Sequence, residues 1–179
     1  MPLPLVWLGA AVTAAYTGNK IAKSLSRDEG NIAVFPGERS MLPVVPLNGA
    51  ILCCGIYNVL IHTGIWWEGK IVELAGTGLI RAVSVERFLA DRSGNTTYIA
   101  CNASAQAIAD EQWALRAIDR LFTYSPYDVI NNNCHRFVAQ CMLTAPPPVT
   151  RFGQLNRLLS SHHCGQTYWH PADIREFDI

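Results

Sequence analysis

The sequence predicts an α+β fold, in which a small antiparallel sheet packs against a helix whose first turn carries a cysteine. Apolar runs at 49–54 and 59–67 are rich in Ile, Val, Leu and Trp and are separated by Gly and Asn, which is typical of strands. Segment 104–122 instead repeats its apolar residues at helical spacing. A second helical segment at 131–143 completes the predicted domain.

The composition limits the classes of function. The chain has 179 residues, half of them hydrophobic and 16% charged, with 14 basic and 14 acidic side chains. This length predicts one domain with a sizeable core. A net charge of zero lacks the basic excess that binding to a phosphate backbone requires, so no nucleic acid partner is expected. The six cysteines form no CxxC pair, which favours a reducing compartment.

The first 18 residues carry no charge and are followed by Lys20, Lys23 and Arg27. This apolar helix is at the lower limit of length for a membrane span and lacks the basic start of a secretory signal. Two interpretations stay open, a membrane anchor or interfacial helix and a buried helix. If it spans, the basic cluster stays cytoplasmic, so we expect a location in the cytoplasm or on the cytoplasmic side of a membrane.

The predicted organisation has three parts. Residues 1–43 form the apolar helix and a Pro-containing connector, 44–145 form the compact domain, and 146–179 form a tail. Within the tail, 152–161 is amphipathic and 162–170 is expected to be irregular. The tail is interpreted as a lid, a second membrane contact or a partner-binding segment.

The shorter elements of the domain follow from local signals. Residues 79–83 and 95–101 are predicted strands, and Ser84 caps a short helix over 85–92. Ser104 opens the longer helix that extends to residue 122. Asn residues at 131–133 cap the helix that follows, and three prolines from 146 end it.

Residues 59–75 are predicted to form a β-hairpin with a two-residue turn at Glu68-Gly69. This turn places Gly64 opposite Glu73, so Glu73 lies one diagonal step from His62 on the same face. The glycine leaves that space open. A carboxylate at this position can orient the His62 imidazole through its second nitrogen.

Cys134 is the candidate nucleophile of the chain. It follows the Asn cap directly, so the free N–H groups and the dipole of the helix favour its thiolate. It shares a face with the apolar residues three, four and seven positions later, which predicts that it points at the sheet. His135 and Arg136 are expected to point away. With His62 as base and Glu73 as its orienting partner, Cys134 completes a candidate triad.

Two motifs resemble the lecithin:retinol acyltransferase-like family, a circularly permuted relative of the papain-like thiol hydrolases. They are His62-Thr63-Gly64-Ile65-Trp66, followed by Val72-Glu73-Leu74-Ala75, and the segment YDVINNNCHRFV at 127–138. The resemblance covers residues 44–143. It implies a permuted papain-like domain in which Cys134 accepts the acyl group and His62 is the base.

The sequence departs from the family pattern at three points. Glu73 stands where the family commonly has a second His, the hairpin is one residue shorter, and His135-Arg136 replaces the common Glu-His pair. A Glu can still orient His62. These changes also permit an inactive relative that keeps the fold.

The resemblance implies a hydrolase or acyltransferase that acts on a lipid ester through a thioester at Cys134, with no cofactor. Trp66 and Asn133 are the candidate substrate-binding residues, and 1–18 are a candidate membrane contact. One alternative is a papain-like peptidase or amidase acting on cell-wall or other peptides. A second is a catalytically degenerate, membrane-associated interaction protein.

The remaining cysteines and histidines have simpler interpretations. Cys53, Cys54, Cys101 and Cys141 have no nearby feature that would lower a thiol pKa, so they are interpreted as core side chains. The histidines and cysteine within 162–170 do not match the spacing of structural zinc sites. No metal is therefore expected.

Overall fold

The computed structural model describes residues 30–39, 41–56, 60–90 and 92–177. The predicted apolar helix at 1–18 lies outside these residues. The strands are β1 (Ile32–Val34), β2 (Ile51–Ile56), β3 (Leu60–Trp67), β4 (Lys70–Leu74), β5 (Ile80–Val83), β6 (Tyr98–Cys101) and β7 (Thr167–Pro171). The α-helices are α2 (Val85–Leu89), α3 (Glu111–Ile118), α4 (Cys134–Met142) and α5 (Phe152–His163). None of the helices in the described part of the chain has the length and apolar character of a membrane span.

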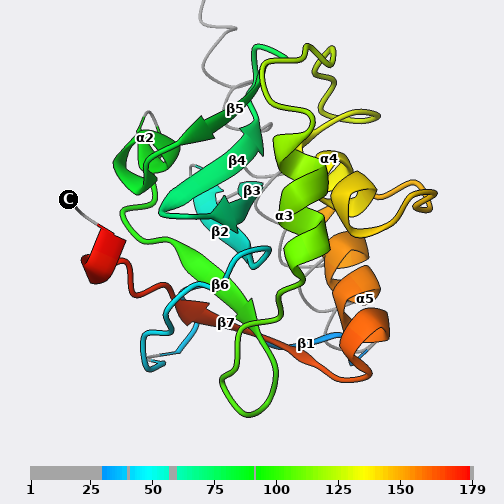
Figure 1. Cartoon of the computed structure of the whole chain (residues 1–179). Coiled ribbons are helices and arrows are strands. Elements are labelled where there is room, and N and C mark those ends of the chain that lie inside the picture. Colours follow the sequence, from blue (N-terminus) through cyan, green and yellow to red (C-terminus); the bar gives the residue numbers. More distant parts are fainter. Residues whose placement is uncertain (1–29, 40, 57–59, 91, 178–179) are drawn as a thin grey trace, which may run out of the picture.

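The fold is mixed α+β, as predicted, and its strands form one sheet in the order β1-β7-β6-β2-β3-β4-β5 (Figure 1). Neighbouring strands are antiparallel except for the parallel pair β1–β7. Both strands of that pair come from outside the predicted limits of 44–145, so the sheet extends beyond them. The prediction of an irregular end at 162–170 was wrong, because β7 pairs with β6 on one side and β1 on the other.

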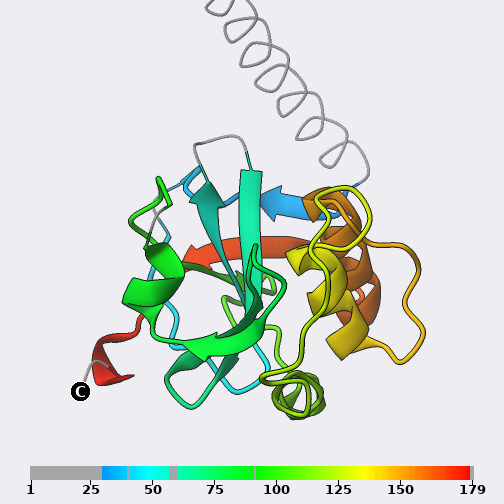
Figure 2. The same ribbon diagram turned by 90° about the horizontal axis from the view of Figure 1, so that it is seen from above.

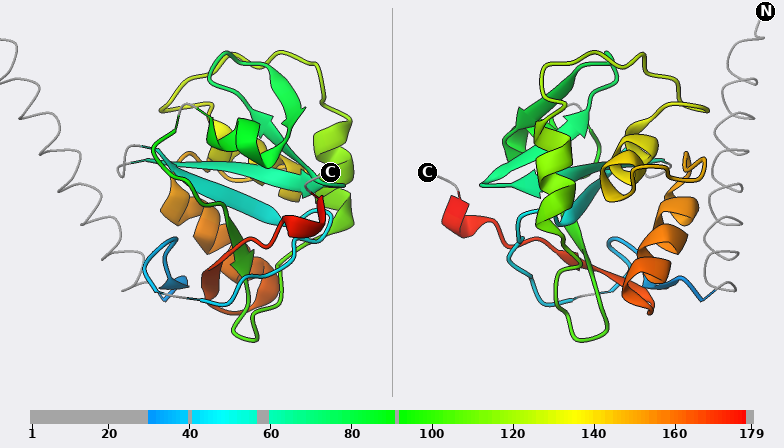
Figure 3. Two further views of the ribbon diagram at one scale, coloured as in Figure 1. Left: turned by 90° about the vertical axis from the view of Figure 1, so that its left-hand side faces the viewer. Right: turned by 45° about the vertical axis from the view of Figure 1, so that its right-hand side comes forward.

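The two faces of the sheet are covered by different segments. Helices α3, α4 and α5 cover one face, whereas α2 and the C-terminal segment cover the other (Figures 2 and 3). In β2, Ile51 and Cys53 therefore face the first layer, and Leu52 and Cys54 face the second. A strand covered on both sides needs no polar positions, which explains the continuous apolar run in the sequence.

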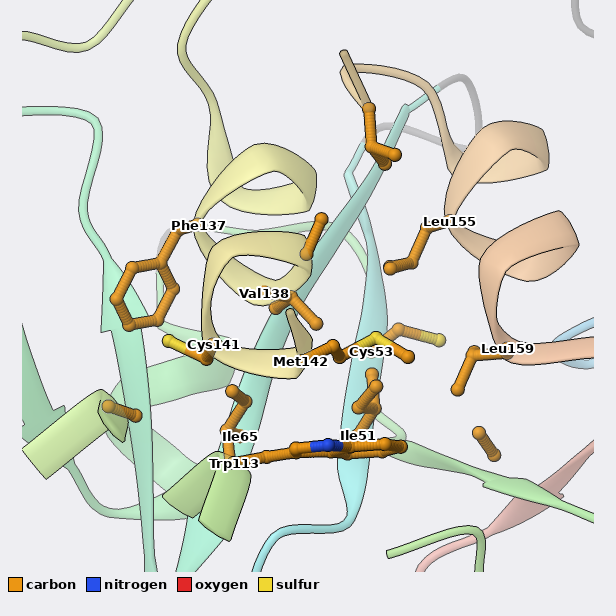
Figure 4. Packing of buried hydrophobic residues seen from close by; sticks show 14 of the residues in the cluster. Ile51, Cys53, Ile65, Trp113, Phe137, Val138, Cys141, Met142, Leu155 and Leu159 are labelled. Carbon is orange, nitrogen blue, oxygen red and sulfur yellow. The ribbon is translucent and has the colours of Figure 1, made fainter. Parts of the chain in front are cut away.

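The larger core lies between the sheet and the three helices (Figure 4). Trp113 of α3 packs beneath Ile51 and Ile65, while Val138 of α4 and Leu155 of α5 close the cluster from the other side. All five side chains are at most 1% exposed. Burying each large apolar side chain contributes about 1.5–3 kcal/mol relative to leaving it in water, so this core fixes α4 against the sheet.

The predicted register of the hairpin is confirmed for the three pairs nearest the turn, whereas Gly64 and Glu73 are paired with β2 and β5 instead of with each other. The paired residues are Ile65 with Val72, Trp66 with Ile71, and Trp67 with Lys70. Glu68 and Gly69 have φ values of 42° and 80°, as a two-residue turn of type I′ requires. At Gly64, an added Cβ would lie 2.5 Å from Cγ2 of Ile71, so only glycine fits there.

The helix predicted over 104–122 is shorter than expected. Asn102 Oδ1 accepts hydrogen bonds from the backbone N–H groups of Ser104 and Gln106, which holds this segment in a turn. Helix α3 begins only at Glu111, after Asp110 caps it by accepting from the N–H of Gln112. A local side-chain bond thus competed successfully with helix formation. The cap that Ser84 gives α2 is confirmed.

Candidate active site

Cys134 is the first residue of α4, and Asn133 is its N-cap, as predicted. The Oδ1 atom of Asn133 accepts from the N–H groups of His135 and Arg136 at 3.1 and 3.3 Å. Its Nδ2 atom donates to the carbonyl oxygens of Val129 and Thr150 at 2.8 and 2.7 Å. The Asn133 amide, proposed from sequence as a substrate contact, is therefore bonded to the backbone on both sides and fixes the loop that presents Cys134.

Replacing Asn133 with Ala is expected to lower the free energy of unfolding by about 2 kcal/mol, because it removes a helix cap and leaves two carbonyl groups without their donor. Asn133→Ser keeps an acceptor for the helix and should lose about half as much. Denaturant titration of both variants measures the difference. Equal stability of Asn133→Ala and wild type would show that the amide does not hold the loop.

His62 and Glu73 meet across the diagonal that the hairpin register predicts. His62 Nε2 lies 2.7 Å from Glu73 Oε2. Beyond the Ile65–Val72 pair, β3 and β4 no longer pair with each other. There β3 stays paired with β2, and β4 stays paired with β5. The His62 side chain is 4% exposed, and its ring packs against Phe88 at 5.2 Å between centroids.

Glu73 is fully buried and binds two arginines besides His62. Arg81 Nη2 lies 2.7 Å from Oε1, and Arg92 Nη2 lies 3.0 Å from Oε2. Burial raises the pKa of Glu73, but the hydrogen bonds from His62 and Arg81 and the charge of Arg92 together lower it to about 2. Glu73 is therefore a carboxylate at any physiological pH.

The sequence analysis missed both arginines. Arg81 stands directly opposite Glu73 in the β4–β5 register, so extending the pairing to the next strand would have found it. Arg92 follows α2 and reaches Glu73 from a loop, and no local pattern indicates that contact.

Cys134 and His62 form an interacting pair. Burial raises the pKa of the Cys134 thiol, but the neighbouring His135 and His62 together hold it well below its ordinary value. Burial lowers the pKa of His62, yet the charge and hydrogen bond of Cys134 and the hydrogen bond of Glu73 raise it. Because Nε2 of His62 binds Glu73, Nδ1 is the ring nitrogen left for the sulfur. These opposite shifts in pKa favour a thiolate beside an imidazolium.

The expectation that His135 points away from the sheet was wrong. Its side chain is buried, with Nδ1 3.1 Å from Thr63 Oγ1 and 4.0 Å from Cys134 Sγ. Helix α4 packs against α3, α5, β3 and β4, and seven of its nine residues are buried. The buried part of the helix surface is thus wider than the single apolar stripe from which we expected His135 to point away. The ring of Phe152 in α5 covers the His135 imidazole at 5.9 Å.

Tyr127 is a further member of the site that the sequence analysis quoted only as part of a motif. Burial, the charge of Cys134 and a hydrogen bond with Cys134 raise the pKa of its phenol to about 12. The phenol therefore stays protonated and donates to the sulfur. It thus adds a polar hydrogen beside the Cys134 sulfur.

Trp66, proposed as a substrate contact, belongs to the core that α2 and the C-terminal segment cover. It is 1% exposed and meets Phe177 edge to face at 5.1 Å. Among the other cysteines, burial raises the pKa of Cys54 and Cys101 to about 12 and that of Cys141 to about 11. Burial therefore favours the protonated thiol at these three positions, in contrast to Cys134, whose pKa is lowered.

The histidines of the 162–170 segment do not converge. His162 packs on Trp113 at 4.8 Å, and His170 Nδ1 lies 3.0 Å from the carbonyl oxygen of Leu42. Within the part of the chain that the structure describes, no group of three or more His, Cys, Asp or Glu side chains is placed to hold a metal ion.

No protein-family model matches the sequence, and neither the curated proteins nor the solved structures show a match to this chain.

Proposed function

We propose that this chain is a cysteine-dependent acyl hydrolase or acyltransferase that acts on a lipid ester through a thioester. One arrangement carries the proposal: Cys134 is the first residue of helix α4, and the buried carboxylate of Glu73 holds His62 at 2.7 Å. The lowered pKa of the Cys134 thiol, to which His62 contributes, supports it. We also propose that the domain is permuted papain-like and related to the lecithin:retinol acyltransferase-like family. In support, the histidine strand precedes the cysteine helix, and both motifs meet at one site.

The mechanism follows from the placement of these groups. The Cys134 thiolate attacks the ester carbonyl, and the new S–C bond leaves a negative charge on the carbonyl oxygen. We assign the N–H of Cys134 at the helix start and the Tyr127 hydroxyl as the donors to that oxyanion. The imidazolium of His62 then gives its proton to the departing alkoxide, and a thioester remains. Water or another acceptor gives a proton to His62 and attacks the thioester, which releases the thiolate.

Glu73 supports an active site over a degenerate one. It replaces the second histidine that the family resemblance implies, yet it hydrogen-bonds His62 at 2.7 Å. Two arginines form ion pairs with the same carboxylate and fix its position. A carboxylate held in this way orients the imidazole and stabilises its charged form.

The loop before Cys134 supports an apolar substrate. Phe122, Tyr124, Val129 and Ile130 are 81%, 70%, 64% and 76% exposed, and all four precede the nucleophile within 12 residues. Phe122 and Tyr124 lie against the start of β5, and Val129 and Ile130 lie in the loop that leads to Cys134. Large exposed apolar side chains favour a lipid over a polar peptide. The uncharged residues 1–18 lie outside the described residues, and we propose that they hold the domain at the cytoplasmic surface of a membrane.

The test uses the full chain carrying Cys164→Ser, because Cys164 is the exposed thiol among the described cysteines. The protein is incubated with phosphatidylcholine vesicles, quenched in acid and weighed by intact mass spectrometry. We expect an acyl-sized increment that hydroxylamine removes and that Cys134→Ala abolishes, or else fatty acid release that depends on Cys134.

Two outcomes contradict the proposal in different ways. If the ultraviolet absorbance of the Cys134 thiolate titrates like that of an ordinary thiol, near pH ~8.5, the enzyme proposal fails. If the thiol is activated but neither adduct nor fatty acid forms, the lipid ester is wrong, and a peptide amide becomes the substrate to test.

A further inference from the structure

We propose that His135 is a second catalytic histidine, which keeps the Cys134 sulfur ionised while His62 carries the proton of the reaction. The inference deepens the proposed function and rests on it, because it divides two tasks between the imidazoles that flank one nucleophile. His62 is bound to a carboxylate, and His135 is bound to a hydroxyl. This difference in partners is the basis of the division.

His135 is held in place from three sides. Its Nδ1 atom lies 3.1 Å from Thr63 Oγ1 and 4.0 Å from Cys134 Sγ, so one ring nitrogen faces both atoms. Phe152 covers the ring from α5. Thr63 is fully buried on β3, and His135 is 7% exposed. The imidazole therefore cannot turn to solvent without breaking a buried hydrogen bond, which is costly.

A proton on Nδ1 of His135 can be shared between the Thr63 oxygen and the sulfur. That N–H favours the charged sulfur over the neutral thiol, because a hydrogen bond to the ionised form stabilises it. His135 need not exchange this proton during turnover. His62, in contrast, must give its proton to the alkoxide and recover one from the acceptor, so it cannot stabilise the thiolate equally at every stage.

Several ionisable groups lie around Cys134: some interact with the sulfur directly, whereas Glu73 and Arg92 act on His62. They are Cys53 and Cys54 on β2, His62 on β3, Glu73 on β4 through His62, Arg92 after α2, Tyr127 before α4, and His135 on α4 itself. Of these groups, His62 and His135 are the ones that lower the pKa of the Cys134 thiol by charge and by hydrogen bonding, while Tyr127 also hydrogen-bonds the sulfur. Comparing variants of the two histidines therefore isolates their contributions.

The test measures thiolate absorbance against pH, from about pH 4 to about pH 9, without any substrate. Each variant in the Cys164→Ser chain is compared with the same variant carrying Cys134→Ala, so the difference belongs to Cys134. His135→Leu is expected to lower the thiolate-to-thiol ratio at pH ~6 at least tenfold, which corresponds to a rise of about one pKa unit. His135→Asn keeps a neutral N–H donor and should lower the ratio less.

Thr63 supplies a second, independent pair of variants. We treat Thr63 as a positioning residue, because it acts on the sulfur only through His135. Thr63→Val removes the hydroxyl but keeps the branched shape, and it should shift the titration in the same direction as His135→Leu. Thr63→Ser restores the hydroxyl and should restore the wild-type titration. A purely structural role of Thr63 would not give this rescue.

His62→Gln completes the comparison. In this variant the Cys134 thiol should still ionise at a lower pH than an ordinary thiol, because His135 remains. Acyl turnover should be lost. If the curves of His135→Asn and Thr63→Val both overlay that of wild type, the inference is wrong while the proposed function stands. If wild type itself titrates like an ordinary thiol, the proposed function fails as well. Should His135→Leu not fold, the other two variants decide the question.

Discussion

His62→Gln is expected to lower acyl turnover by roughly three to four orders of magnitude, because the departing alkoxide and the attacking water lose their proton carrier. A glutamine amide can still donate to Glu73, so the fold should persist. Single-turnover release of fatty acid, or formation of the acyl adduct on Cys134, measures the loss. The remaining rate reports what the activated sulfur achieves without proton transfer.

His170→Gln is the matched control for this variant. His170 is also a buried histidine on the sheet, and its Nδ1 atom faces the Leu42 carbonyl oxygen, away from Cys134. The control should keep turnover within about twofold of wild type, since it tests only the loss of a buried imidazole. Turnover of His62→Gln within threefold of the control would exclude His62 as the proton carrier.

Glu73→Gln is expected to lower the free energy of unfolding by about 3–5 kcal/mol at neutral pH, because Arg81, Arg92 and His62 lose the one carboxylate that they share. Its pKa is lowered from 4.5 to about 2, so the folded state favours the ionised form. This contribution is fully present above pH ~4.5 and is lost as the pH falls through about 2.

Denaturant titration at pH 7, 5 and 3 tests this pH dependence. The free energy of unfolding of wild type should fall as the pH is lowered. That of Glu73→Gln should fall less, because this variant has no carboxylate at position 73 to protonate. Glu111→Gln, an exposed carboxylate in the first turn of α3, should change stability by less than about 1 kcal/mol at each pH. If the free energy of unfolding of Glu73→Gln fell with pH as steeply as that of wild type, Glu73 would not be the source of the pH dependence.

The pairing of His62 with Glu73 could be predicted because it depends on two local rules. A two-residue turn fixes the register of a hairpin, and alternation along a strand fixes the face of each side chain. The cap at Asn133 follows equally from a local rule, since an Asn before an apolar helical run satisfies free N–H groups. These predictions needed no knowledge of what packs against the hairpin.

The roles of His135 and Arg92 could not be predicted in this way. Whether His135 faces solvent or protein depends on α5, which lies beyond the predicted domain and covers that side of α4. Arg92 reaches Glu73 from a loop, where no periodicity defines a direction. Both contacts arise only when segments distant in sequence pack together.

The order of the strands also has a consequence for how the protein folds during synthesis. Strand β7 lies between β1 and β6, and Ile32 pairs with Thr167. While the ribosome is still making residues 102–166, β6 has an open edge and β1 has no neighbour. Such edges can pair with other chains, and contacts between residues this distant in sequence form slowly. The emerging chain therefore depends on β7 to close its sheet, and the half-made protein is the form most exposed to aggregation.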